Sequence, residues 1–113
     1  MRIAIDFDGT IVEYEYPKIG KAIPGAIETL LELQKAGHEL VLWTYRSGTN
    51  LQEAIDYCEE NGLVFYAANA NHPDEMWKEG MARLIKADVF IDDRNVGGLP
   101  LWSDVREHFL KGK

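Results

Sequence analysis

Two aspartates, Asp6 and Asp8, directly follow a short apolar run and belong to the pattern Asp-Phe-Asp-Gly-Thr at 6–10. The apolar run is typical of a buried parallel strand, so both carboxylates stand where that strand ends. Gly9 allows the backbone to turn sharply just beyond them. Two like charges so close together are costly to bury unless a cation or a proton compensates them. A solvated turn would need only one Asp and a Gly, so the pair indicates a metal or acid–base site.

Two further polar signatures follow expected strands, namely Thr44 after 39–43 and the pair Asp92 and Asp93 after 88–91. Open parallel sheets bind ligands at the carboxyl ends of their strands, so we expect these side chains to meet Asp6 and Asp8 there. Oxygen ligands of this kind favour Mg²⁺, which is often completed by water and a substrate phosphate. One carboxylate can then attack phosphorus while the other moves a proton, which is the chemistry of phosphoryl transfer.

Strand and helix patterns alternate along the chain, which predicts an α/β fold with a three-layer, Rossmann-like open parallel sheet flanked by helices. The expected strands cover 3–7, 39–43, 63–66 and 88–91. An alternating segment at 11–22 predicts a small hairpin. Four helices are expected. The first begins at Pro24 and ends before Gly37, and the second begins at an Asn50–Glu53 capping pair and ends at Gly62. The third covers 76–84, and the fourth runs from a Ser103 cap to about residue 110.

The motifs and their order resemble the haloacid dehalogenase (HAD) superfamily across nearly the whole chain. The segment 6–10 resembles its motif I, Thr44 its motif II and Ile-Asp-Asp at 91–93 its motif IV, and the hairpin resembles its flap. The stretches between the motifs are filled by core elements, so the chain resembles a capless member. The resemblance implies a phosphatase that depends on Mg²⁺.

The resemblance also implies roles for individual residues. Asp6 is expected to be the nucleophile and, with the backbone carbonyl of Asp8, a ligand of Mg²⁺. Asp8 is expected to be the general acid and base, and Thr44 to hydrogen-bond the phosphoryl oxygens. Asp92 is expected to complete the metal shell, directly or through water, with Asp93 supporting it.

The motif III lysine of this superfamily has three candidates here, because no single position is distinctive. Lys86, just before the fourth expected strand, is our choice as the catalytic lysine, with Lys78 and Arg83 as alternatives. Each of them also fits an ordinary solvated charge on a helix.

Three residues near the motifs are candidates for substrate binding together with Thr44, namely Tyr45, Arg46 and Asn69. Arg46 fits a bidentate contact to phosphate and equally an ion pair with the acidic cluster. Asn69 follows the third expected strand, where ordinary turn chemistry is the alternative.

Size and composition limit the classes of function. A chain of 113 residues with 46% hydrophobic residues predicts one domain over 1–113. The net charge of −7 argues against a direct nucleic-acid surface. The lone Cys58 lies on an expected apolar helix face, and the three histidines are isolated, so a nucleophilic thiol and a zinc site are not expected. No apolar run approaches the roughly 18 residues of a membrane span, so we expect a cytoplasmic protein.

The leading hypothesis is therefore a Mg²⁺-dependent phosphomonoester hydrolase that acts through an aspartyl-phosphate on Asp6. A non-catalytic phosphate- or metal-binding module, or a regulatory subunit, is the alternative, and transfer to an acceptor other than water is a third reading. Because no cap closes the site, either a large phosphorylated substrate covers it or a neighbouring subunit of a homo-oligomer does.

Overall fold

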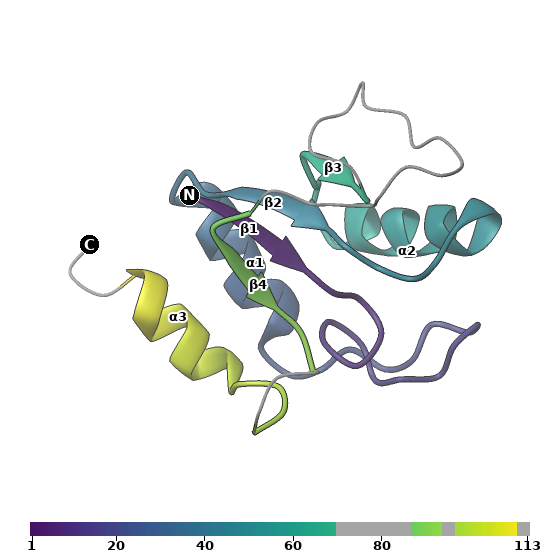
Figure 1. Cartoon of the computed structure of the whole chain (residues 1–113), viewed down its shortest axis with the longest axis horizontal. Coiled ribbons are helices and arrows are strands. Elements are labelled where there is room, and N and C mark those ends of the chain that lie inside the picture. The colour runs from purple at the N-terminus through teal and green to yellow at the C-terminus, as the bar shows by residue number, and fades with distance from the viewer. Residues whose placement is uncertain (70–86, 94–96, 111–113) are drawn as a thin grey trace.

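The computed structural model describes residues 1–69, 87–93 and 97–110 (Figure 1). In this part of the chain four strands form one parallel sheet in the order β3-β2-β1-β4. The strands are β1 (Arg2–Ile5), β2 (Glu39–Leu42), β3 (Ala67–Ala68) and β4 (Val89–Ile91). The predicted α/β fold with a parallel sheet is thus confirmed.

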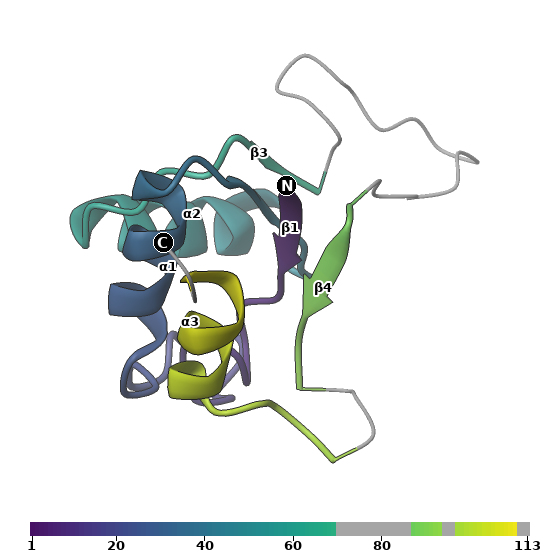
Figure 2. The same ribbon diagram turned by 90° about the vertical axis from the view of Figure 1, so that its left-hand side faces the viewer.

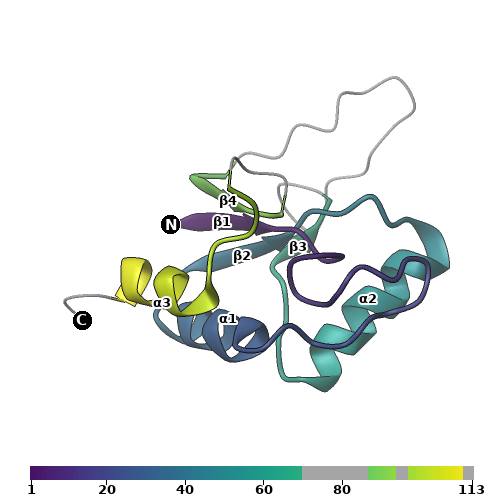
Figure 3. The same ribbon diagram turned by 90° about the horizontal axis from the view of Figure 1, so that it is seen from below.

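Three described helices lie on one face of this sheet (Figure 3). They are α1 (Ala26–Lys35), α2 (Gly48–Glu60) and α3 (Trp102–Leu110). α3 packs beside α1, as the turned view shows (Figure 2). None of these described helices combines the length and the apolar character needed to cross a bilayer. The helix predicted over 76–84 lies outside the described residues, so the predicted third layer stays a prediction.

The core forms between the sheet and the helices because the strand residues alternate in direction. Ile3 and Ile5 of β1 are fully buried in the main cluster, whereas Ala4 packs with Val41 in a separate small cluster. The helices bury their own apolar stripes in the main cluster, with Leu30, Leu33, Ala54, Cys58, Trp102 and Val105 among the buried residues. Full burial of an aliphatic side chain contributes about 1.5–3 kcal/mol.

The register of the strands brings their carboxyl ends level. Ile5 of β1 pairs with Leu42 of β2 and with Ile91 of β4. The pairing continues one residue further, since the N–H of Asp6 donates to the Ile91 carbonyl at 3.0 Å and that of Trp43 to the Ile5 carbonyl at 2.8 Å. The residues that follow these strands therefore start from one edge of the sheet.

The third strand lies later than predicted. In the described part of the chain the residues that pair with β2 are Ala67 and Ala68, and of the predicted 63–66 it is Tyr66 whose N–H reaches β2, at the Leu40 carbonyl at 2.8 Å. Leu63 is used differently, because its N–H closes the turn after α2 by donating to the Cys58 carbonyl at 2.9 Å, and its side chain is fully buried in the main core.

Two predicted caps were also wrong. α2 begins at Gly48 after Ser47, so Asn50 lies inside the helix and does not start it. α3 begins at Trp102, which places Ser103 within its first turn.

The segment predicted as a hairpin forms an irregular loop closed by an antiparallel contact. Val12 bridges Ala22, and the N–H of Glu13 donates to the Lys21 carbonyl at 2.7 Å. No regular strands form within it. We call residues 13–21 the flap loop, and it stands beside the carboxyl edge of the sheet.

Candidate active site

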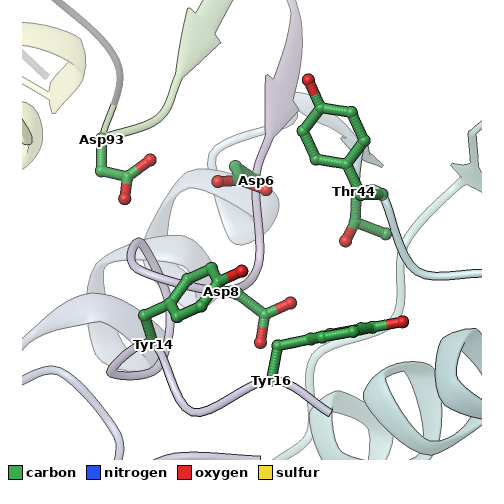
Figure 4. A pocket seen from close by; sticks show the side chains of 7 residues that line it. Asp6, Asp8, Tyr14, Tyr16, Thr44 and Asp93 are labelled. Atoms are coloured by element: carbon green, nitrogen blue, oxygen red, sulfur yellow. The ribbon is translucent and has the colours of Figure 1, made fainter.

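A pocket of about 220 Å³ opens at the carboxyl edge of the sheet (Figure 4). The polar side chains that line it come from three segments that follow strands: Asp6 and Asp8 after β1, Thr44 after β2, and Asp93 after β4. Three tyrosines complete the wall, namely Tyr14, Tyr16 and Tyr45. Asp6, Asp8, Thr44 and Asp93 are thus brought together, whereas the sequence analysis missed Tyr14 and Tyr16.

Asp6 lies in an electrostatically strained position at the centre of this group. Burial raises the pKa of Asp6 from 3.8 to about 6. A hydrogen bond from the backbone N–H of Phe7 opposes this rise, while the charges of nearby aspartates add to it, namely Asp93, Asp8 and Asp92. The Thr10 hydroxyl also lies 3.5 Å from Asp6 Oδ2 as a donor. A bound cation would relieve this repulsion and favour the ionised carboxylate.

Asp8 is held by a two-pronged contact with Arg46. Arg46 Nε donates to Asp8 Oδ2 and Arg46 Nη2 to Asp8 Oδ1, each at 2.8 Å. The guanidinium is 0% exposed and the Asp8 side chain 9% exposed, so this ion pair is shielded from water. A carboxylate has about four acceptor directions, so Asp8 can line the pocket while Arg46 fixes its orientation.

The remaining donors of Arg46 bind backbone carbonyls, so this residue does not face the pocket. Its Nη1 donates to Pro17 at 3.2 Å and to Asn50 at 3.3 Å, and its Nη2 donates to Lys18 at 2.9 Å. Of the two interpretations given for Arg46, the structure has the ion pair with the acidic cluster, and Arg46 is not among the residues that line the pocket. Arg46 joins Asp8, the flap loop and the first turn of α2.

Thr44 is positioned by its own loop and by Asn69. The Thr44 N–H donates to Asn69 Oδ1 at 2.8 Å, and the Thr44 hydroxyl oxygen accepts from the N–H of Arg46 at 3.2 Å. Asn69 Nδ2 donates in turn to the Arg46 carbonyl at 3.3 Å. Asn69 is not among the pocket-lining residues, so it braces the loop after β2 instead of taking the substrate-binding position expected for it.

The aspartates after β4 occupy places different from those expected. Asp93, not Asp92, lines the pocket. The Asp93 carboxylate packs against Gly9, whose φ is +84°, and a Cβ on Gly9 would clash with it. Asp92 remains close enough to Asp6 to add to its charge repulsion. Of the two aspartates that follow Ile91, it is therefore Asp93 whose side chain lines the pocket.

Several predicted positions lie outside the described residues, including all three candidates for the motif III lysine: Lys86, Lys78 and Arg83. Cys58 is fully buried, and burial raises the pKa of its thiol to about 12, in agreement with its predicted place in the core. Tyr45 lines the pocket at its expected place after Thr44.

The donor set fits Mg²⁺ better than a metal that needs a closed protein cage. No three acidic, histidine or cysteine side chains of the described segments lie close enough together to hold one ion. Mg²⁺ is commonly held by one or two carboxylates together with water and substrate phosphate. Asp6 and Asp93 could supply such carboxylates, and the raised pKa of Asp6 marks where a positive charge is favoured.

Comparisons with known proteins give two solved structures. One is a D,D-heptose 1,7-bisphosphate phosphatase from B. bronchiseptica, solved with magnesium and phosphate. It is 24% identical, with a TM-score of 0.50 over 74% of this chain and 55% of that one, which shows a shared α/β fold. No protein-family model and no curated protein sequence matches the chain.

The other structure is that of a conserved protein from Bacteroides thetaiotaomicron. It is 54% identical to this chain, with a TM-score of 0.90, and the match covers 100% of this chain and 92% of that one. Such identity over the full length goes beyond a shared fold, and the chain belongs to the same family as this conserved Bacteroides protein.

Proposed function

We propose that the protein is a capless member of the HAD superfamily that hydrolyses phosphate monoesters with Mg²⁺. The observation that carries this proposal is the meeting of Asp6, Asp8, Thr44 and Asp93 in one pocket at the carboxyl edge of a parallel sheet. The fold shared with the heptose bisphosphate phosphatase, itself solved with magnesium and phosphate, supports it.

Asp6 serves as the nucleophile in this proposal. One of its carboxylate oxygens attacks phosphorus, the bond from phosphorus to the ester oxygen breaks, and an aspartyl-phosphate forms on Asp6. Its place directly after β1, anchored by the backbone bond to Ile91, fixes the attacking group on a rigid element. When bound, Mg²⁺ would neutralise the charges of Asp6 and of the phosphoryl group that faces it.

Asp8 acts as the general acid and then as the general base in this proposal. In its protonated form Asp8 gives its proton to the departing ester oxygen, and the carboxylate that results then takes a proton from the water that attacks the aspartyl-phosphate, which returns Asp6 and Asp8 to their starting states and releases phosphate. Arg46 acts through Asp8 as a positioning residue, because it holds both carboxylate oxygens. Thr44 offers its hydroxyl to a phosphoryl oxygen, and Asp93 is the aspartate after β4 that would hold the metal, with Asp92 supporting it. Lys86 stays our choice for the motif III lysine.

Phosphate release from a panel of phosphate monoesters tests this function. We expect release that requires Mg²⁺, is abolished by EDTA, and falls by about 10⁴-fold or more in Asp6→Asn, because the nucleophile is removed. Asp56→Asn is the matched control, since Asp56 is an exposed acid on α2 that accepts from Gln52 at 2.9 Å and is not part of the pocket.

The outcomes separate the readings of the site. Full activity in Asp6→Asn would rule out the aspartyl-phosphate route. Binding of Mg²⁺ or phosphate without turnover of any ester would favour the non-catalytic module instead. A new phosphate ester formed in place of inorganic phosphate would identify a phosphotransferase.

A further inference from the structure

Three tyrosines surround the carboxylates of the pocket, and they come from two separate segments. Tyr14 and Tyr16 belong to the flap loop, and Tyr45 follows Thr44 after β2. Scattered exposed aromatic residues need no explanation, but here three of the seven residues that line one pocket are tyrosines. We use the term tyrosine rim for Tyr14, Tyr16 and Tyr45.

The three rings of the rim differ in how much of their surface is exposed. The Tyr16 ring packs on the Arg46 guanidinium at 5.2 Å, and its hydroxyl accepts from Asn50 Nδ2 at 3.4 Å. Tyr14 and Tyr45 are 68% and 81% exposed, although both line the pocket. Figure 4 shows Tyr14 and Tyr16 around Asp8 at the opening. Much of the aromatic surface of Tyr14 and Tyr45 is therefore accessible at the mouth of the pocket, whereas Asp8 is almost fully buried.

The charges of the pocket limit what can occupy this mouth. Among the described residues the wall contains three carboxylates, one hydroxyl and the tyrosine rim, and Arg46 is buried behind Asp8. In the described part of this wall, a second phosphate on the substrate would meet carboxylates and aromatic faces and no positively charged side chain. An uncharged planar ring would instead find the flat apolar surface on which aromatic groups stack.

The size of the pocket places such a ring at the rim. Its volume of about 220 Å³ is below the roughly 300–1,000 Å³ of pockets that enclose a whole small ligand. The carboxylates can therefore enclose the phosphoryl group and the atoms next to it, while the rest of the substrate extends over Tyr14 and Tyr45. A substrate in which a sugar separates the aromatic ring from the phosphoryl group fits this arrangement, because the phosphoryl group can lie among the carboxylates while the ring lies on the tyrosines.

We propose that the substrate is a nucleoside monophosphate whose base stacks on the tyrosine rim, an inference that rests on the proposed phosphatase function. The phosphate binds between Asp6 and Thr44, the ribose crosses the mouth, and the base lies against Tyr14 and Tyr45. Stacking of one base on aromatic side chains corresponds to roughly 5- to 150-fold in affinity.

The test compares substrates that differ only in the base. With Mg²⁺ present, we expect kcat/KM for adenosine and cytidine 5′-monophosphates to exceed that for ribose 5-phosphate by about 10-fold or more. Tyr14→Ala and Tyr45→Ala are expected to lower this ratio several-fold, while Tyr14→Phe retains it because a phenyl ring also stacks. Tyr66→Ala is the control, since Tyr66 is exposed but lies 5.5 Å from Arg2 at the other end of β1.

Binding measurements keep this inference separate from the proposed function. Equal turnover of nucleotides and ribose 5-phosphate would overturn the inference and leave the phosphatase intact. If no ester were hydrolysed, calorimetry with Mg²⁺ would decide instead. Binding of adenosine 5′-monophosphate about 10-fold tighter than that of ribose 5-phosphate, with a smaller difference in affinity in Tyr45→Ala, would support the stacking site. Equal or absent binding would overturn it.

Discussion

The contact between Arg46 and Asp8 should make a large contribution to stability, and Arg46→Met removes it while keeping an unbranched, though shorter, side chain. The guanidinium makes five hydrogen bonds, two to Asp8 and three to backbone carbonyls, and it is 0% exposed. Removing one partner of a buried ion pair leaves the other charge uncompensated, at a cost of about 3–5 kcal/mol. At about 4 °C per kcal/mol for a domain of this size, Tm should fall by about 12–20 °C.

Urea unfolding of four variants, Arg46→Met, Asp8→Asn, the double variant and a control, measures this contribution. We expect Arg46→Met to lose about 3–5 kcal/mol of unfolding free energy, and Asp8→Asn/Arg46→Met to recover part of the loss because no buried carboxylate is left unpaired. Arg106→Met is the matched control. Both side chains of its ion pair with Glu32 are exposed, so losing this pair should lower the free energy of unfolding by under about 1 kcal/mol.

Two results would refute the reasoning. One is an Arg46→Met variant that is no less stable than Arg106→Met. The other is a double variant whose loss equals the sum of the two single losses, since that would show that Asp8 and Arg46 do not interact energetically.

Two further predictions concern the metal and the turn after β1. Since burial raises the pKa of Asp6 to about 6, its proton stabilises the fold below about pH 4 and this contribution is lost as the pH rises through 6. Mg²⁺ competes with that proton, so it should raise Tm more at pH 7.5 than at pH 5, and an equal rise would exclude Asp6 as a ligand. Gly9→Ala should displace Asp93 and abolish phosphate release. Gly37→Ala is its control, because Gly37 also has a positive φ but open space around its Cβ, so it should lose about 1 kcal/mol of stability and keep its activity.

The sequence predicted the sheet and its carboxyl-edge site because both depend on local patterns. Short apolar runs mark β1, β2 and β4, and the polar residues that follow them meet wherever parallel strands are in register. β3 could not be found in this way. Its two residues, Ala67 and Ala68, carry no β-branched or aromatic signal, whereas the more strand-like 63–66 has Val64 and Tyr66 exposed.

The role of Arg46 depends on contacts that no local pattern reveals. Asp8 is 38 positions away in the chain, and the carbonyls of Pro17 and Lys18 belong to the flap loop. Tyr14 and Tyr16 were read only as part of an alternating segment, and their closeness to Tyr45 requires that this loop fold back over the sheet edge. Long-range closure of this kind is a property of the packed chain, not of spacing.

The Arg46–Asp8 pair also bears on the proposed metal site, because it offsets the charge of one carboxylate in a pocket that gathers several. Asp6, Asp8 and Asp93 bring three negative charges to the described wall, and Arg46 compensates one of them from behind. Two negative charges remain, on Asp6 and Asp93, and these match the charge of one Mg²⁺. Because the compensated carboxylate is Asp8, the residue proposed to move protons is set apart from the two that would hold the metal. In the proposed mechanism Arg46 would thus separate Asp8, the acid–base residue, from Asp6 and Asp93, which would hold the metal, and losing it should impair both the fold and the separation of these roles.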